Sequence, residues 1–288
     1  MIHKLPDGRN LGYAEYGKLT GSPVFFFHGT PGSKAFHPLL DVTERLGVRL
    51  ICVERPGYGE STFQPNRRLL DWGKDIASLA DALQLDRFAV SGHSGGGPHT
   101  LACAYTLPDR VTAAAILSGA GPVDTPNATE GMIWLNWFGF TFGRYMPWWF
   151  GRSLTGYLFR EQAANPSKAI DKDEAIRLKV DNDILNIPSI RENCIQSDVG
   201  AYAQGTQGLA WDVRLLTRPW GFKLEDIKVP VYLWHGTADN YTSMKMVRYM
   251  AEKIHNCKVT ICEGEGHMLL IPHWEEVLAT LVQTPVAV

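Results

Sequence analysis

A serine stands among glycines in the stretch Gly92-His93-Ser94-Gly95-Gly96. This is the spacing of a nucleophile elbow, a sharp turn from a strand into a helix that holds a serine hydroxyl clear of both elements. Such a turn strains the serine backbone by roughly 1–3 kcal/mol, and side chains at Gly92 and Gly96 would collide with the neighbouring strand and helix. Ser94 is therefore the candidate nucleophile. His93 is predicted to pack in the elbow rather than to act as a second base.

Two further residues have the chemistry that a serine nucleophile needs. A serine hydroxyl reacts only when a base takes its proton, and the base needs an acid that fixes its tautomer. Asp239 follows an apolar run that begins at Val231, and His267 follows another at residues 258–262. Because the carboxyl ends of parallel strands meet at one edge of a sheet, we expect both side chains to lie near Ser94.

The elements that must position these residues alternate between strands and helices. Continuous apolar runs are typical of parallel strands that are covered on both faces. Such runs occupy residues 24–27, 48–53, 88–90, 111–117, 231–235 and 258–262. Helical patterns occupy residues 34–47, 69–83, 100–105, 243–254 and 273–282. With an antiparallel edge strand at residues 10–16, this order predicts an α/β fold whose mostly parallel central sheet is flanked by helices.

The alternation of strands and helices is interrupted at residues 122–221. An aromatic-rich stretch and a more polar helical stretch fill this interval. We therefore predict a helical cap inserted into a core that consists of residues 1–121 and 222–288. The aromatic-rich stretch is apolar on more than one helical face, so part of it is expected to roof a substrate pocket. Its tryptophans are Trp134, Trp137, Trp148 and Trp149.

A lid that touches a membrane is the alternative role for this aromatic stretch. Arg144 and Pro147 interrupt the apolar run and basic residues are sparse, so the sequence favours the pocket roof. Arg144, Arg152 and Arg160 are expected to be solvated charges rather than ligands of a substrate carboxylate. The N-terminus has no apolar signal segment and no run spans a bilayer cleanly, so we expect a cytoplasmic protein.

The composition argues against several classes of protein. The 288 residues are 45% hydrophobic and 20% charged, which suits one large domain or a domain with an insertion. A formal net charge of −2 offers no basic field for nucleic acid, so a small molecule is the expected partner. The five cysteines are odd in number and lack C-x-x-C spacing, which argues against a disulfide framework and a zinc site. We expect no metal and no cofactor, and either a monomer or a homodimer.

In four ordered motifs the chain resembles the α/β-hydrolase superfamily, in the branch whose oxyanion loop reads His-Gly-x-Pro-Gly. That loop is His28-Gly29-Thr30-Pro31-Gly32 here, directly after an apolar strand, and the order of Ser94, Asp239 and His267 is that of the fold. The resemblance implies that the backbone N–H groups of Thr30 and Gly95 form an oxyanion hole. The residues expected around the substrate pocket are His28, Gly29, His93, Trp134, Trp137 and Trp148.

The sequence leaves alternatives for the acid and the base. Asp239 could serve only as the N-terminal cap of a helix, and Asp124, after the strand at residues 111–117, is the rival acid. Two departures from the family pattern are Glu54, where many relatives have aspartate, and Asn240, where relatives often have valine. The first is interpreted as structural, and the second affects the shape of the acid loop. The rival histidines are His28, His235 and His273.

Together these motifs predict a serine hydrolase that cleaves carboxylic esters with apolar or aromatic groups through an acyl-enzyme. A proline-type aminopeptidase shares the oxyanion loop and carbon–carbon bond hydrolases use the same triad, so both are alternatives. Epoxide and haloalkane hydrolases have an aspartate where this chain has Ser94, which disfavours them. A non-catalytic small-molecule sensor is the alternative of another class, since this fold also hosts receptors.

Overall fold

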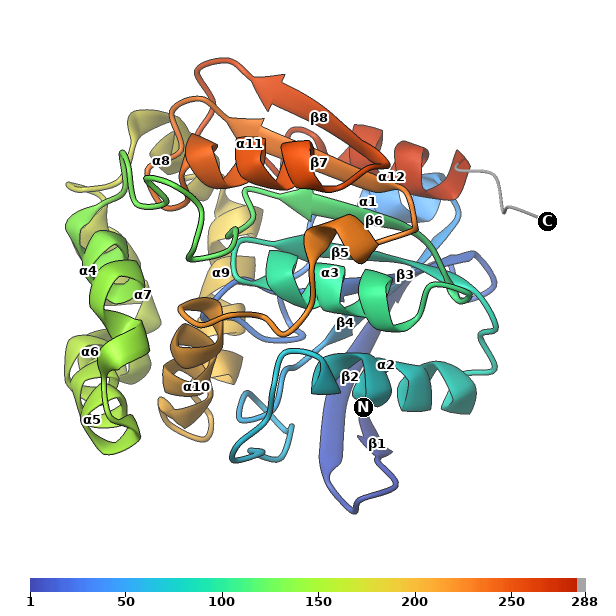
Figure 1. Ribbon diagram of the computed structural model, residues 1–288, viewed down its shortest axis with the longest axis horizontal. Coiled ribbons are helices and arrows are strands. Elements are labelled where there is room, and N and C mark those ends of the chain that lie inside the picture. The colour runs from blue at the N-terminus through green and yellow to red at the C-terminus, as the bar shows by residue number, and fades with distance from the viewer. Residues whose placement is uncertain (284–288) are drawn as a thin grey trace.

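The computed structural model describes residues 1–283, and an eight-stranded sheet runs through its centre (Figure 1). The strand order is β1-β2-β4-β3-β5-β6-β7-β8. β2 pairs antiparallel with β1 and β4, and the neighbours from β4 onward pair in parallel, as predicted. The strands are β1 (Ile2–Lys4), β2 (Asn10–Gly17), β3 (Ser22–Phe27), β4 (Val48–Val53), β5 (Phe88–His93), β6 (Val111–Leu117), β7 (Val231–Gly236) and β8 (Cys257–Cys262).

Helices cover both faces of the sheet. Successive side chains of a strand point to opposite faces, so Phe25 and Phe27 of β3 join one apolar cluster and Phe26 joins another. The first cluster includes residues of α2 (Asp71–Ala82), α3 (Gly96–Thr106) and α11 (Met244–Lys253). The second includes residues of α1 (Leu40–Arg45) and α12 (Trp274–Gln283).

The connection from β6 to β7 forms a helical cap. In Figure 1 its helices lie to the left of the sheet, at the carboxyl ends of the parallel strands, and η2 (Leu224–Asp226) leads back toward β7. The predicted boundaries at residues 121 and 222 fall in the loops that flank these helices. The cap contains α4 (Trp134–Phe142), η1 (Gly143–Tyr145), α5 (Trp148–Leu158), α6 (Arg160–Ala164), α7 (Pro166–Asp173), α8 (Lys179–Leu185), α9 (Pro188–Ala201) and α10 (Gln207–Leu216).

Two elements differ from the sequence prediction. The helix predicted over residues 34–47 is confined to α1, because Pro38 has no backbone N–H and disfavours helical backbone at His37. Asn193 of α9 instead accepts a hydrogen bond from the His37 N–H (3.2 Å) and donates one to the Ala35 carbonyl (2.8 Å). β2 was predicted at the sheet edge, but β1 pairs with it and takes that position.

Candidate active site

Ser94 lies at the tight turn between β5 and α3. Its backbone φ is 54°, in the left-handed region that costs a residue with a side chain roughly 1–3 kcal/mol. The N–H groups of Gly97 and Ala120 donate to the Ser94 carbonyl at 3.0 and 3.1 Å, which holds this conformation. A Cβ at Gly92 would lie 2.6 Å from the carbonyl oxygen of Gly96. Glycine is therefore required beside this turn, for the steric reason predicted from the sequence.

His267 and Asp239, on the loops after β8 and β7, form a hydrogen-bonded pair. The Nδ1 atom of His267 lies 2.9 Å from Oδ2 of Asp239. The other carboxylate oxygen accepts hydrogen bonds from the backbone N–H groups of Tyr241 (2.8 Å) and Thr242 (3.1 Å). The carboxylate is thus fixed in one orientation, and the pairing at Nδ1 leaves Nε2 as the ring atom that can take up a proton.

The two partners determine each other's charge. Burial lowers the pKa of His267, but the charge of Asp239 and its hydrogen bond outweigh burial and raise that pKa above its ordinary value. Burial raises the pKa of Asp239, yet His267 more than offsets this and brings the pKa well below the ordinary range. Asp239 is therefore ionised at neutral pH, which favours proton uptake by a histidine acting as general base.

His93 and Tyr241 enclose the imidazole of His267. Nε2 of His93 donates to the carbonyl oxygen of His267 at 3.0 Å, and the Tyr241 ring stacks on the imidazole with centroids 4.9 Å apart. Burial lowers the pKa of His93 to about 3, so its ring is neutral and supports the loop. Within residues 1–283, no hydrogen bond joins the Ser94 hydroxyl to the His267 ring. Such bonds are often long in unliganded enzymes and tighten when substrate binds.

The rival residues have other surroundings. Asp124 is exposed and lines a surface groove with Trp220 and Lys223, whereas Asp239 occupies the position beside the histidine. His28 is buried and hydrogen-bonds through Nδ1 to the Gly29 carbonyl at 2.7 Å. Burial holds the pKa of His28 well below its ordinary value, so this ring is neutral and shapes its loop.

Thr30 and Gly95 approach each other beside Ser94. A Cβ at Gly95 would lie 2.7 Å from the Thr30 Cβ, so glycine is needed for this approach. All three residues line one cavity. Gly95 directly precedes α3, and the N-terminus of a helix carries partial positive charge. An oxyanion hole requires donors in such a position, next to the attacking serine.

A buried ion pair that the sequence did not predict connects the core to the cap. Nε of Arg55, on the loop after β4, lies 2.7 Å from Oδ2 of Asp212 on α10, and both side chains are fully buried. Arg67 binds the other carboxylate oxygen, and the Tyr58 hydroxyl donates to Asp212 at 2.9 Å. Burial opposes ionisation of Asp212, but the two arginines lower its pKa far below the ordinary range. The carboxylate is therefore charged inside the protein.

Arg55 also holds the predicted oxyanion loop. Its guanidinium donates to the carbonyl oxygens of His28 (2.5 Å) and Gly29 (2.7 Å) and to Oγ1 of Thr30 (2.9 Å). One arginine thus joins the carboxylate on α10 to the loop that carries Thr30. The position of this loop depends on a helix of the cap.

A second buried aspartate of the cap holds the histidine loop. Asp181, on α8, is fully buried and accepts hydrogen bonds from the backbone N–H groups of His267 (3.0 Å) and Met268 (2.8 Å). A Cβ at Gly266 would lie 2.5 Å from this carboxylate, so the approach requires glycine. Asp181 also contributes to the raised pKa of His267. These roles could not be recognised from the sequence, because Asp181 and Asp212 resemble the other acidic residues of a polar helical stretch.

A cavity of about 150 Å³ lies between the core and the cap. Thr30, Ser94 and Gly95 line it from the core side. None of the described residues that line it is acidic, and Arg214 carries the one charged side chain among them. The apolar side chains of the cap that line it include Leu135, Phe138, Phe140, Met146, Trp148, Leu154 and Leu158.

The residues predicted for the pocket fall into two groups. Trp148 lines the cavity. Trp134 and Trp137 instead face outward, with 67% and 45% of their surface exposed. Because α4 is apolar on more than one face, the periodicity of its sequence does not show which of its side chains face the core. His28, in the loop after β3, and His93, the last residue of β5, are both buried. Of the predicted pocket residues, His28, Gly29, His93, Trp134 and Trp137 are not among those that line this cavity.

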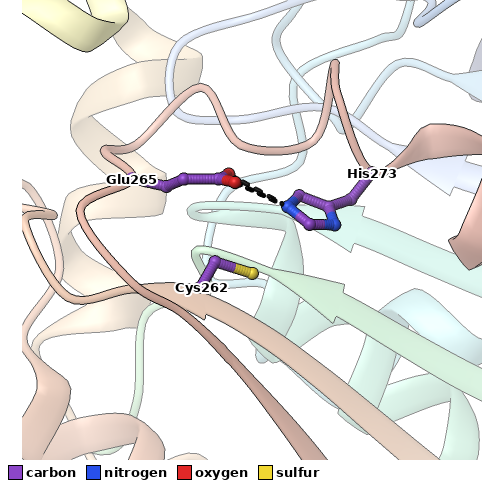
Figure 2. Close-up of side chains that lie close together, drawn as sticks. All are labelled: Cys262, Glu265 and His273. Atoms are coloured by element: carbon purple, nitrogen blue, oxygen red, sulfur yellow. Dashed lines mark hydrogen bonds and ion pairs between the residues drawn. The ribbon is translucent and has the colours of Figure 1, made fainter.

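Cys262, Glu265 and His273 form a separate cluster at the end of β8 (Figure 2). Their potential ligand atoms lie within 4.8 Å of one another. However, Nε2 of His273 already lies 2.9 and 3.0 Å from the two carboxylate oxygens of Glu265, and Nδ1 lies 3.2 Å from Glu276. Burial raises the pKa of the Cys262 thiol to about 11, so the thiol is protonated at neutral pH. We interpret the cluster as an ion pair beside a buried thiol.

Known proteins resemble this chain in sequence and in fold. A family model described as alpha/beta hydrolase fold matches residues 22–273. A non-heme chloroperoxidase from Streptomyces lividans is 35% identical over 128 residues, which are 43% of this chain and 46% of that protein. A proline iminopeptidase from Lactobacillus helveticus is 24% identical over 299 residues and 94% of each chain. A thermophilic esterase from Thermogutta terrifontis superposes with a TM-score of 0.67 at 21% identity, over 98% of this chain and 96% of that one. The matched part spans less than half of the chloroperoxidase, and the similarity to the esterase concerns the fold alone.

The buried carboxylate on α10 provides a test of how the cap is held. Asp212→Asn leaves Arg55 and Arg67 buried without their counter-charge, so we expect a loss of about 3–5 kcal/mol in the free energy of unfolding. Urea titration measures this loss. Asp183→Asn, on exposed α8 surface beside Lys179, is the matched control and should change stability by about 0.5 kcal/mol at most.

The pH dependence of the free energy of unfolding is a second test of the Asp212 ion pair. The pKa of Asp212 is lower in the folded than in the unfolded chain, so its contribution is complete above about pH 4 and is lost as pH falls further. The Asp212→Asn variant should lack this component of acid destabilisation. Equal stability of the two asparagine variants would contradict the role assigned to the ion pair.

Proposed function

Because the chain belongs to the alpha/beta hydrolase fold family, we propose that Ser94, His267 and Asp239 form a catalytic triad that hydrolyses carboxylic esters with apolar or aromatic groups. The family and its relatives support a hydrolase. The observation that carries the ester proposal is the cavity beside Ser94, whose described lining is mostly apolar, with Arg214 as its one charged side chain and no acidic side chain.

Each residue has a role that follows from its position. Asp239 holds Nδ1 of His267, so Nε2 accepts the proton of the Ser94 hydroxyl as its oxygen attacks the ester carbonyl. The backbone N–H groups of Thr30 and Gly95 stabilise the oxyanion of the tetrahedral intermediate. His267 then gives the proton to the leaving alcohol. Water, activated by the same histidine, hydrolyses the acyl-enzyme and releases Ser94.

A proline-type aminopeptidase is the second candidate, supported by the similarity to the Lactobacillus helveticus proline iminopeptidase over 94% of both chains. An aminopeptidase must bind the ammonium group of its substrate, and a carboxylate is the usual partner of a buried cation. The described lining has Arg214 and no carboxylate, which favours the ester. Turnover of p-nitrophenyl esters distinguishes the esterase from the peptidase, which would cleave proline anilides, and from a sensor, which would bind without turnover.

Alanine substitutions test the triad directly. Because the serine and the histidine act as one unit, Ser94→Ala and His267→Ala should each leave at most the roughly 10³–10⁴-fold acceleration over water that oxyanion stabilisation and binding supply. The double variant should lose little more. Steady-state kinetics with p-nitrophenyl butyrate measure these losses. Additive losses in the double variant would show that the two residues do not act together.

The pH profile tests the acid. Since a general base must be neutral, kcat/KM should rise as pH passes the raised pKa of His267. Asp239→Asn removes the charge that raises this pKa, so the rise should move to lower pH, and kcat should fall by up to about 10⁴. Asp124→Asn is the control and should alter neither quantity. If both variants fold but Asp124→Asn lowers kcat more than Asp239→Asn does, the catalytic acid would be Asp124.

Trp148 and Trp137 form a matched pair for testing the cavity, because the first lines it and the second faces outward. Burial is worth about 0.8 kcal/mol per methylene, so each added methylene could raise kcat/KM by about four-fold until the cavity is full. Measured on p-nitrophenyl acetate, butyrate and hexanoate, Trp148→Ala should flatten this dependence and Trp137→Ala should leave it unchanged. If folded Trp148→Ala lost the same factor on all three esters, the acyl chain would not bind against Trp148.

A further inference from the structure

The outer surface of the cap carries an unusual number of exposed aromatic rings. They lie on α4, η1 and α5, which Figure 1 places at the far left of the molecule, away from the sheet. α4 has no buried residue. Monomeric soluble proteins rarely leave so many large apolar side chains together in water. The most exposed are Trp134 (67%), Tyr145 (73%), Trp149 (70%) and Tyr157 (62%), followed by Trp137, Phe142 and Phe150. We call this surface, with its exposed arginines described below, the aromatic face.

The same two helices have an inner side with a different role. Leu135 and Phe138 of α4 and Trp148 and Leu154 of α5 line the cavity beside Ser94. The inner side chains therefore hold these helices over the core. The aromatic face contributes little to that packing, because its side chains point away into solvent. Packing against the core therefore does not explain why this surface carries so many aromatic side chains.

The charge of this segment is one-sided. Residues 131–160 contain no aspartate or glutamate, in a chain whose formal net charge is −2. Arg144, Arg152 and Arg160 are all exposed, and none forms a salt bridge within residues 1–283. Two of these arginines form cation–π contacts. The guanidinium carbon of Arg144 lies 5.3 Å from the ring centroid of Tyr145, and that of Arg160 lies 4.1 Å from the ring centroid of Tyr157. Two of the three arginines thus lie against exposed rings of this segment, and Arg160 also has the carboxylate of Glu161 as its neighbour in the chain.

We propose that the aromatic face docks on the surface of an anionic lipid bilayer. Tryptophan and tyrosine rings prefer the boundary between lipid headgroups and acyl chains, and arginines beside them attract anionic headgroups. None of the helices in the described part of the chain is long and apolar enough to cross a bilayer, so the contact is peripheral. A second copy of the chain fits less well, because a symmetric contact would bring two sets of three arginines together.

This docking goes beyond the proposed ester chemistry and does not depend on it. α4 and α5 each carry docking residues on one side and cavity residues on the other. If the proposed function is also correct, an apolar ester dissolved in the bilayer would enter the cavity from the docked side. The sequence favoured a pocket roof over a membrane contact, but the exposures divide these two roles between opposite sides of the same helices.

Flotation with lipid vesicles tests the proposal on the intact chain. The probes are vesicles of phosphatidylcholine alone and vesicles that also contain phosphatidylglycerol. We expect binding to the anionic vesicles that weakens with added salt, because salt screens exposed charges. The Trp134→Ala/Trp149→Ala double variant should bind at least about ten-fold more weakly, because it loses the two most exposed indole rings. Removing the arginines should weaken binding by about five-fold for each one removed.

A matched control shows whether binding depends on the arginines of the aromatic face or only on the total positive charge of the chain. The variant that changes Arg144, Arg152 and Arg160 to serine is compared with one that changes the exposed Lys18, Lys74 and Lys258 to serine. Both remove three positive charges, and only the first should lose binding. All of these side chains are exposed, so circular dichroism should show native folding in both.

Three results would overturn the proposal. The first is that the folded chain binds neither kind of vesicle. The second is that the lysine and arginine variants lose binding equally. The third is a concentration-dependent dimer without lipid that Trp149→Ala abolishes, which would assign the aromatic face to a second copy. Vesicle binding by Ser94→Ala should equal that of the unaltered chain, so failure of the proposed chemistry and failure of docking are measured separately.

Discussion

The ion pair between Arg55 and Asp212 joins the cap to the core with both charges fully buried. Burying a charge is tolerable only when it is paired and its remaining donors are satisfied. The guanidinium meets this condition by also binding the carbonyl oxygens of His28 and Gly29. Hence the shape of the predicted oxyanion loop, the charge of Asp212 and the docking of α10 depend on one another. Without the docked cap, Arg55 would lack its counter-charge.

Asp181 is a second carboxylate of the cap that binds a loop of the core, in this case the loop that carries His267. It binds the backbone of His267, while Asp239 binds the ring of that residue. Two carboxylates, one from the cap and one from the core, therefore fix the position of the proposed base. The residues that would do the chemistry come from the core, but the loops that carry Thr30 and His267 are held by the cap. If the proposed function is correct, a change in how the cap docks would alter catalysis as well as substrate choice.

Three residues of the proposed site could be predicted from the sequence because of their places in the sheet. Ser94, Asp239 and His267 each follow a strand, and a parallel sheet collects such residues at one edge. Asp212 and Asp181 could not be recognised in this way. Their partners lie 157 and 86 residues away, and these contacts exist only after the cap has docked.

Two differences between the sequence analysis and the structure have identifiable physical causes. α4 is apolar on more than one face, so helical periodicity could not tell that Trp134 faces solvent while Leu135 lines the cavity. In the helix predicted over residues 34–47, the contacts of Asn193 with Ala35 and His37 replace helical hydrogen bonds. The contacts of Asn193 come from a distant part of the chain and a local window does not contain them, whereas Pro38 lies inside the predicted helix and is visible in the sequence.

The central claim is that the strained turn after β5 presents Ser94 to the cavity as a nucleophile activated by His267. Labelling with a fluorophosphonate probe, followed by digestion and mass spectrometry, measures this most directly. The account predicts one modified residue, Ser94, with labelling slowed by orders of magnitude in His267→Ala. A label on another residue with Ser94 unmodified, or equal labelling rates with and without the histidine, would contradict it.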